Sequence, residues 1–341
     1  MGDGKKGDAF LTPRVLGLLG ILVWMIVGVR QLLTTEASYQ IGPNDILIDA
    51  QMTEDAIDAV ELQRRRLRLA DRRYLTLPEF TEFCHDTPGC YLPPTTAPLT
   101  RNEVLFVVAT SGAMQDVFMP AILRTWGAMG MVFAFSDRPD ENLSVFSPPG
   151  LLGANANGDD QKRQPKGFKW LMQEPQFSDF HLEDVKWVVF ADDDTWINAP
   201  RLLGFLGRIN YELPLAMGYF WDEVFSHTAH MSAGAGMIFS AAAAQRLGQH
   251  LYGGRCKAEA FSGVVWADVL LSTCAHDLKA LSVHSYLFHA KPQENLLFGG
   301  QQMDPSAIKE AFTFHVATAD EQEVMTDIVL RNLKGAIERP T

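Results

Sequence analysis

From residue 103 onward, short apolar runs alternate with segments whose apolar residues recur at helical spacing. The predicted strands are 104–110, 131–137 and 185–191, and the predicted helices are 114–127, 167–173 and 199–207. This alternation predicts a largely parallel, twisted α/β sheet with helices on both faces. In open sheets of this class, ligands bind just beyond the carboxyl ends of the strands. Side chains at those ends are therefore the first candidates for function.

An apolar segment near the N-terminus indicates a membrane protein. Residues 15–29 carry no charge, and leucines just beyond them extend the segment, so residues 15–34 predict a transmembrane helix that serves as a signal anchor. Three basic residues precede the uncharged run 15–29, and only Arg30 follows that run at once. The positive-inside rule therefore places residues 1–14 in the cytosol. A cleaved signal peptide is the alternative, but no clear cleavage site follows. The rest of the chain is expected in the lumen of the secretory pathway.

The segment 35–100 is interpreted as a luminal stem and linker. Between residues 53 and 75 it carries six arginines among leucines, which could lie on membrane headgroups or bind a partner; a solvated stem helix is the more frequent structure. Three prolines follow between residues 93 and 98, which is typical of a linker. The main folded domain is expected at residues 101–335.

Size and charge exclude one class of function. The chain has 341 residues, of which 47% are hydrophobic, enough for one large or two ordinary domains. Its formal net charge is −12 and its pI is near 5.2, whereas proteins that grip nucleic acid usually carry a basic patch. Nucleic acid is therefore not expected as a partner. No pattern indicates an oligomeric state.

Four cysteines predict two disulfides in a chain that enters the secretory pathway. Cys84 lies close to Cys90, and Cys256 and Cys274 lie farther downstream, so two local bridges are expected, although three pairings are possible. A zinc site is the alternative, but the tight CxxC or histidine spacing of such sites is missing. Asn142 begins an Asn-Leu-Ser sequon, which a luminal protein can use for glycosylation.

Three consecutive acids, Asp192, Asp193 and Asp194, follow the predicted strand 185–191. A solvated turn is the alternative, but Gly, Ser or Asn would normally interrupt the acids there. Because they come directly after an almost continuous apolar run, we expect these carboxylates to be partly desolvated and to repel one another. A divalent cation such as Mg²⁺ or Mn²⁺ would neutralise them and could bridge the phosphates of a substrate.

The segment VKWVVFADDDTW, residues 185–196, resembles the W-x-x-x-x-DDD-x-(Tyr/Trp) segment of the Fringe and core 1 β1,3-galactosyltransferase family. Other segments resemble further blocks of that family in the same order along the chain. They are VLFVVATS with ILRTWG, FAFSDRPDE, HMSAGAGMIFS, ADVLLSTC, LFHAKPQENL and FTFHVATADEQEVM. The resemblance covers residues 103–330. It implies a GT-A glycosyltransferase fold and a Golgi enzyme.

The resemblance implies a Mn²⁺ site that holds a UDP-sugar donor and stabilises the charge on its departing diphosphate. Asp194 would bind the ion directly, and Asp192 would act nearby, through water or on the ribose. His289 matches the histidine that supplies a nitrogen ligand. His315 lies in a second matched block and is a reserve candidate, for which a structural role is favoured.

Asp268 occupies the position of the family's catalytic base. Inverting sugar transfer needs one base to take the proton from the acceptor hydroxyl. A helix N-cap is the alternative role, because the residues that follow Asp268 can be helical. Ala267 and Ser272 replace an acid and a glycine that are usual in the family, which leaves the acceptor class open.

The resemblance also implies contacts to the donor. Thr110 and Asp137 match positions that hold the uracil and ribose. Gly234 and Gly236 would let a sugar or nucleotide approach the backbone closely, although a tight turn between strands is the alternative. Ala233 replaces the first glycine of the family's pair.

The function implied by these matches is inverting, metal-dependent transfer of a hexose, with galactose from UDP-galactose expected, in β1,3 linkage to a glycan or glycoprotein. A Fringe-like N-acetylglucosaminyl or glucosyl transferase is one alternative. A catalytically silent relative that acts as a chaperone or glycan-binding protein is another, but it would have no reason to retain Asp192, Asp194, Asp268 and His289 together. The expected location is the Golgi or ER membrane, with the catalytic domain in the lumen.

Overall fold

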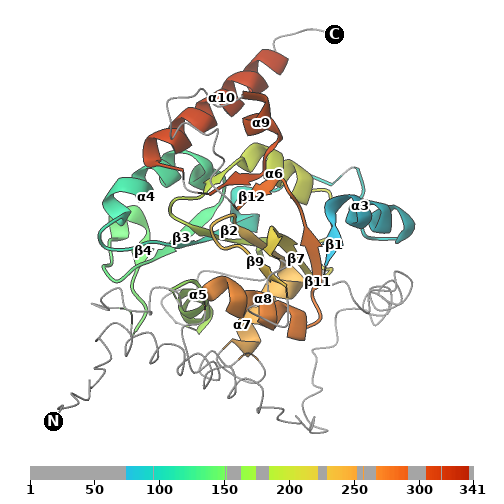
Figure 1. Ribbon diagram of the computed structural model, residues 1–341, viewed down its shortest axis with the longest axis horizontal. Helices are drawn as coiled ribbons and strands as arrows, with labels where there is room; N and C mark the ends of the chain where they lie inside the picture. The colour runs from blue at the N-terminus through green and yellow to red at the C-terminus, as the bar shows by residue number, and fades with distance from the viewer. Residues whose placement is uncertain are drawn as a thin grey trace, which may run out of the picture. The chain divides into compact units, whose positions relative to one another are not determined.

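The structure describes the folded domain, which includes the last part of the predicted stem (Figure 1). The computed structural model describes residues 74–94, 96–149, 151, 163–173, 184–221, 229–251, 256, 266–290, 305–315 and 317–337. All of them belong to the unit Met52–Thr341. The predicted cytosolic tail, the predicted transmembrane helix and most of the predicted stem lie outside the described residues. Among the helices that are described, none is both long and apolar enough to cross a bilayer.

An eight-stranded sheet forms the centre of the domain, in the order β1-β11-β7-β10-β5-β2-β3-β4. The strands, in that order, are Leu75–Thr76, Leu281–His284, Leu215–Gly218, Met237–Ser240, Trp187–Asp192, Val104–Ala109, Met131–Phe135 and Val145–Phe146. Only β10 runs antiparallel to its two neighbours. The other strands run parallel to one another, so the prediction of a largely parallel sheet is confirmed. Their carboxyl ends share one edge of the sheet.

Helices cover both faces of this sheet (Figure 1). On one face the core includes residues of α3, α4, α6, α9 and α10, and on the other it includes residues of α5, α7 and α8. The helices, in chain order, are Leu77–Asp86, Gln115–Arg124, Arg163–Gln173, Ala199–Leu206, Ala241–His250, Ala267–Asp277, Pro305–Glu310 and Ala319–Ile337. Strand β2 shows why two faces are needed: Phe106 packs into one core and Val107 into the other, as alternate residues of a strand must.

Two small sheets extend beyond the large one. One has the order β12-β13-β6, formed by Phe288–His289, Thr313–Phe314 and Trp196–Ile197. The other pairs β8, Phe220–Trp221, with β9, His230–Met231. The three-stranded sheet bears on the acids because β6 begins two residues after the last of them.

The folded domain begins earlier than residue 101. Strand β1 pairs with β11, and Phe80 and Phe83 of α3 are buried in the core of the large sheet, within the segment interpreted as stem and linker. Cys84 and Cys90 form a disulfide just after these residues. The prolines between 93 and 98 therefore lie in a connection inside the domain rather than in front of it.

Candidate active site

The three acids form a turn between β5 and β6, which we call the acidic turn (residues 192–194). The Asp193 N–H donates to the Ala109 carbonyl at the end of β2. The Thr195 N–H donates to the Asp192 carbonyl, and the Thr195 hydroxyl accepts from the Asp192 N–H. These backbone contacts fix the turn at the carboxyl edge of the sheet, where the sequence predicts ligand binding.

Asp192, Asp194 and His315 come together as a possible metal-binding group. Each offers one ligand atom, and the three atoms lie within 4.8 Å of one another. His315 Nε2 is 3.6 Å from an Asp194 carboxylate oxygen. Ligands on opposite sides of an octahedral ion are about 4.2 Å apart when each bond is about 2.1 Å. Small side-chain movements would therefore bring the three atoms onto one ion.

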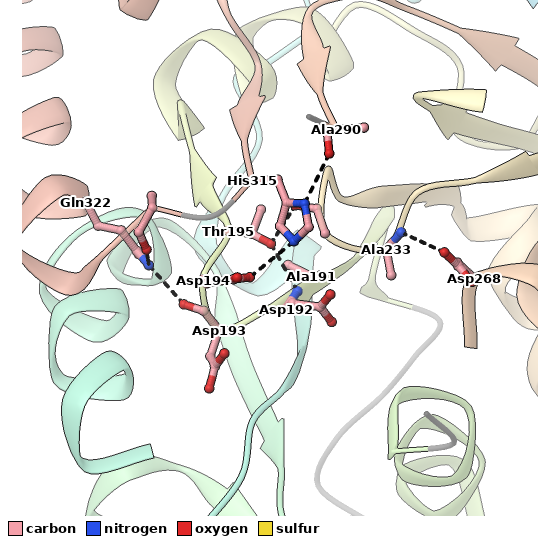
Figure 2. A network of polar contacts seen from close by, with 12 residues as sticks. Ala191, Asp192, Asp193, Asp194, Thr195, Ala233, Asp268, Ala290, His315 and Gln322 are labelled. Carbon is pink, nitrogen blue, oxygen red and sulfur yellow. Dashed lines mark hydrogen bonds and ion pairs between the residues drawn. The ribbon is translucent and has the colours of Figure 1, made fainter. Parts of the chain in front are cut away.

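The other ring nitrogen of His315 determines which tautomer is present (Figure 2). Nδ1 lies 3.2 Å from the Ala290 carbonyl oxygen. A carbonyl can only accept a hydrogen bond, so Nδ1 must carry the proton. In the neutral imidazole, Nε2 is then unprotonated and presents its lone pair toward Asp194. A histidine whose second nitrogen is held by a carbonyl in this way is typical of metal ligands.

His289, the histidine predicted to bind the ion, is not part of this group. In the parallel pair β12–β13 it lies opposite Phe314, and the two rings stack at 4.5 Å between centroids. Phe314 in turn stacks on Trp196 of β6. Because successive residues of a strand point to opposite faces, His315 points away from this stack and toward the acidic turn. Burial lowers the pKa of His289, which favours the neutral ring.

The three carboxyl groups of the acidic turn resist ionisation. Burial, followed by the charges of Asp194, Asp193 and Asp268, raises the pKa of Asp192 to about 8. Burial raises the pKa of Asp193 to about 6, against the lowering effect of its hydrogen bond from Thr110. Burial also raises the pKa of Asp194, opposed by the charge of His315. A bound cation would reverse this penalty, so the residues present fit a divalent metal site.

Asp268 lies in the first turn of α8, on the other side of the acidic turn from α10. One carboxylate oxygen accepts from the Val269 N–H at 2.8 Å. The other accepts from the Ala233 N–H at 3.4 Å (Figure 2). The N-cap of α8 is Trp266, so Asp268 is not the cap residue. Burial raises the pKa of Asp268, opposed by the Val269 N–H and by the charge of His230. A raised pKa makes the carboxylate a stronger base.

Thr110 and Asp137 lie where strands β2 and β3 end. Thr110 is buried, and its hydroxyl donates to Asp193 at 2.6 Å. Asp137 accepts from the Gly112 N–H at 2.8 Å and lies 3.5 Å from the guanidinium of Arg163, whose side chain is largely buried. Desolvation opposes ionisation of Asp137, but these donors hold its pKa below the ordinary value. The structure thus brings both residues to the edge that carries the acidic turn.

Gly234 and Gly236 lie in the turn before β10, and they differ from each other. Gly236 has a φ of +84°, a conformation that residues with a side chain rarely adopt. For Gly234 the constraint is space, because a Cβ there would lie 2.1 Å from His315 Nε2. The alternative of a turn between strands is therefore correct for the backbone of this segment.

Cys256 and Cys274 are free thiols in the structure, so the second predicted disulfide is not formed. Both are buried, and they lie next to each other. The hydrogen bond to Cys256, together with burial, raises the pKa of the Cys274 thiol. The expected partners are thus brought together without a covalent bond.

Two buried glutamines support the acidic turn, and neither has a signal in the sequence. Gln164 of α5 donates to the Ala191 carbonyl at 2.9 Å and to Asp192 at 3.0 Å. Gln322 of α10 donates to the Asp193 carbonyl at 2.9 Å and accepts from the Trp126 indole at 3.0 Å. Gln164 follows a basic residue and Gln322 stands between two glutamates, a pattern typical of the polar face of a helix, so only the tertiary structure reveals their role.

Comparison with known families decides the classification. Residues 99–329 match the Fringe-like family. The chain belongs to the Fringe-like family. The resemblance recognised in the sequence is thereby confirmed, and the matched region contains all three members of the metal-binding group as well as Asp268.

Curated relatives of this Fringe-like chain are identical to it at about a quarter of the aligned residues. One is the human "Beta-1,3-glucosyltransferase", 25% identical over 213 residues, covering 62% of this chain and 40% of that protein. Another is the mouse "Chondroitin sulfate synthase 3", 27% identical over 214 residues, covering 57% of this chain and 23% of that protein. The matched part of the chain thus spans less than half the length of either relative.

Solved structures resemble the Fringe-like chain more distantly. A glycosyltransferase involved in the glycosylation of the major capsid of PBCV-1 is 10% identical, with a TM-score of 0.36 over 66% of this chain and 99% of that one. A TM-score this low does not establish a shared fold.

Proposed function

We propose that this chain is an inverting, metal-dependent hexosyltransferase of GT-A type. It takes a hexose from a UDP donor and attaches it in β1,3 linkage to a hydroxyl of a glycan or glycoprotein acceptor. The observation that carries the proposal is the meeting of Asp192, Asp194 and His315 within 4.8 Å of one another, at the sheet edge where such ligands bind. Family membership supports it.

In this proposal Asp194 and His315 bind the ion directly, and Asp192 acts beside them. His315 takes the place of the predicted ligand His289, because its Nε2 faces Asp194 while His289 stacks on Phe314. When bound, a divalent cation such as Mn²⁺ neutralises the diphosphate of the donor and the charge that develops as it leaves. Thr110 and Asp137 would hold the nucleoside at the ends of β2 and β3.

Asp268 is the proposed catalytic base. It lies close enough to Asp192 for its charge to raise that residue's pKa, so base and metal-binding group share one site. A single base is what inversion at the sugar carbon requires, because one displacement links the acceptor oxygen directly to that carbon. Asp268 removes the proton of the acceptor hydroxyl as the new bond forms. The raised pKa of Asp268 favours this transfer.

Two donor sugars have support. UDP-galactose follows from the resemblance to core 1 β1,3-galactosyltransferases, and UDP-glucose is supported by the name of the human relative, a β-1,3-glucosyltransferase. Both hexoses would make the same demands on the metal group and the base. The donor is therefore a separate question from the chemistry.

We also propose that residues 15–34 anchor the chain in the Golgi or ER membrane with the catalytic domain in the lumen. Asn142 is exposed, as a luminal glycosylation site must be. Expression of the full chain in a secretory eukaryotic cell should give a glycoform that an N-glycosidase removes and that Asn142→Gln abolishes. A chain that carries no glycan at Asn142 and resists carbonate extraction no better than a luminal protein would contradict the placement.

The test of the enzyme uses the purified full chain and measures UDP release from UDP-galactose, UDP-glucose and UDP-N-acetylglucosamine, with and without Mn²⁺ and with candidate acceptors. Asp194→Ala should abolish Mn²⁺-dependent release. Asp268→Asn should lower kcat by about 10²- to 10⁴-fold while Mn²⁺ binding is retained. Asp327→Asn is the control, because Asp327 is exposed and pairs with Arg331 one turn away on the surface of α10.

The same experiment separates the enzyme from a silent relative. A wild-type chain that binds Mn²⁺ or UDP but releases no UDP with any donor or acceptor would overturn the enzymatic proposal in favour of a binding or chaperone role. Release that is unaffected by Asp268→Asn would leave a transferase but refute Asp268 as its base.

A further inference from the structure

The ring of His315 occupies the space where a side chain at position 234 would begin. A Cβ built on Gly234 would lie 2.1 Å from His315 Nε2, 2.3 Å from Cδ2 and 2.4 Å from Cε1. These are its three nearest neighbouring atoms, and all belong to one imidazole. Real Cβ atoms essentially never approach other heavy atoms this closely. As long as the His315 ring stays where it is, only glycine fits at position 234.

The backbone at Gly234 cannot move away to relieve such a contact without breaking others. The Gly234 carbonyl accepts from the hydroxyl of Thr195, the residue that follows the acidic turn, at 2.9 Å. The next carbonyl, that of Ala235, accepts from the hydroxyl of Thr313. The segment is thus tied on one side to the acidic turn and on the other to the strand that leads into His315.

The constraint at Gly234 is spatial rather than conformational. Among the glycines of the described residues, only Gly89 and Gly236 have a φ in the positive region that disfavours a side chain. The Gly234 backbone therefore accepts an alanine, provided that the His315 ring leaves its position. Because that ring is the end of a side chain, rotation is the cheapest way to make room.

The ring has only one orientation that serves the metal group. With Nδ1 on the Ala290 carbonyl, Nε2 faces Asp194, and the ring lies against Gly234 between these two contacts. Rotation away from Gly234 breaks the contact of Nε2 with Asp194, the contact of Nδ1 with Ala290, or both. The missing side chain at position 234 is thus a condition for the ligand geometry.

We propose that Gly234 is a positioning residue for the metal site: by having no side chain, it lets the His315 imidazole lie against its backbone and complete the group with Asp192 and Asp194. The sequence predicted a different role for this glycine, close approach of sugar or nucleotide. The proposal rests on the proposed function, in which Asp194 and His315 bind the ion. It assigns Gly234 no contact with substrate.

The expected consequence of Gly234→Ala is loss of metal affinity with the fold retained. Displacement of an outer-shell partner typically lowers metal affinity by about 10- to 100-fold, and a displaced ligand should cost at least that much. Gly204→Ala is the matched control. It makes the same substitution in α6, where a Cβ would meet nothing within 4 Å.

The test is a double-mutant cycle on the full chain, with Mn²⁺ affinity measured by electron paramagnetic resonance or titration calorimetry and melting temperature measured in the absence of metal. The four proteins are wild type, Gly234→Ala, His315→Ala and the double variant. If Gly234 acts only by making room for the ring, Gly234→Ala lowers affinity by about 10- to 100-fold in the wild-type background. It then has no further effect on affinity once His315 is alanine.

Each outcome separates this inference from the function on which it rests. Wild type that binds no Mn²⁺ refutes the proposed metal dependence, whereas wild type that binds and Gly234→Ala that binds equally well refute only the role of Gly234. Equal losses of affinity in both backgrounds also refute it, because the effect would then not pass through His315. If Gly234→Ala does not fold, the double variant must recover folding, since it removes the clash; failure to recover overturns the inference.

Discussion

His289 ends β12, and His315 directly follows the neighbouring parallel strand β13, yet the two histidines have different surroundings. His289 is opposite Phe314 and adds a third ring to the stack of Trp196 and Phe314. His315 follows Phe314 by one residue and therefore points to the other face, where the acidic turn lies. A shift of one position along a strand thus separates a packing histidine from a candidate ligand.

The two histidines also differ in the groups around the ring, and those around His315 suit a metal ligand. His315 has a carbonyl on Nδ1, a carboxylate near Nε2 and a glycine under its ring. His289 has a partly buried, stacked ring, and desolvation lowers its pKa. Both rings are partly buried, so the carbonyl on Nδ1 and the acid facing Nε2 are what distinguish His315.

Removing the two rings separately tests the difference between His289 and His315, and we expect the largest effect here. His315→Ala should lower Mn²⁺ affinity by more than the roughly 10- to 100-fold typical of outer-shell changes, and UDP release at limiting Mn²⁺ should fall with it. His289→Ala should leave Mn²⁺ affinity unchanged and instead lower the melting temperature, because it removes one ring of a stack. Titration of both variants with Mn²⁺ measures the difference, and the reverse pattern would restore His289 as the ligand.

A middle-sized effect is expected where α10, which follows the small sheet, meets the acidic turn. Gln322→Leu leaves the Trp126 indole N–H without its acceptor and the Asp193 carbonyl without its donor. Leaving a buried polar group unpaired costs about 1–3 kcal/mol, so the free energy of unfolding should fall by about that amount. Urea denaturation measures it. Gln245→Leu, at an exposed position of α7, should change it little, and equal losses in the two variants would refute the structural role of Gln322.

The smallest effect concerns the charge of the acidic turn itself. The pKa of Asp192 is about 8 in the folded chain and near 4 when unfolded, so between these values the folded state binds more protons. Protonated Asp192 does not destabilise the metal-free protein at low pH. As pH rises toward 8, its ionisation lowers the free energy of unfolding. Asp192→Asn removes that loss and should raise the melting temperature in EDTA at pH 8 by about 2–4 °C, the shift that roughly 1 kcal/mol produces in a domain of this size.

At pH 5 the advantage of Asp192→Asn should be much smaller, because pH 5 is close to the unfolded pKa and most of the loss occurs between pH 5 and pH 8. At pH 8, saturating Mn²⁺ should make the wild type melt at a higher temperature than Asp192→Asn. Binding at 100 times Kd adds about 2.7 kcal/mol to the free energy of unfolding of the wild type and little to that of the variant. Melting curves at both pH values, with EDTA and with Mn²⁺, test this. An advantage that is the same at pH 5 and pH 8 would show that the stabilisation does not come from the charge.

The sequence was sufficient for those parts of the fold that local patterns encode. Strands β2, β3 and β5 are nearly continuous apolar runs, and α4, α5 and α6 have helical periodicity, so their presence and the parallel direction of the strands followed from rules of α/β proteins. The position of Asp192–Asp194 at a strand end followed from the same reading. Strand β10, which runs antiparallel between β7 and β5, has only four residues and carried no comparable signal.

The parts that sequence could not supply depend on long-range register. Whether His289 or His315 faces the acidic turn is decided by the pairing of two-residue strands, β12, β13 and β6, which come from distant parts of the chain. Gln164 and Gln322 reach the turn only because α5 and α10 pack beside it. Conversely, the prolines between 93 and 98 indicated a boundary, although β1 and α3 before them belong to the core.

The most direct test of the central claim is anomalous diffraction at the manganese edge from a crystal of the chain soaked with Mn²⁺ and UDP. The account predicts one anomalous peak between the Asp194 carboxylate and His315 Nε2, with Asp192 beside it, the Nδ1 of His315 still on the Ala290 carbonyl, and His289 still stacked on Phe314. A peak bound by His289 instead, or no peak at the acidic turn at saturating Mn²⁺, would contradict it.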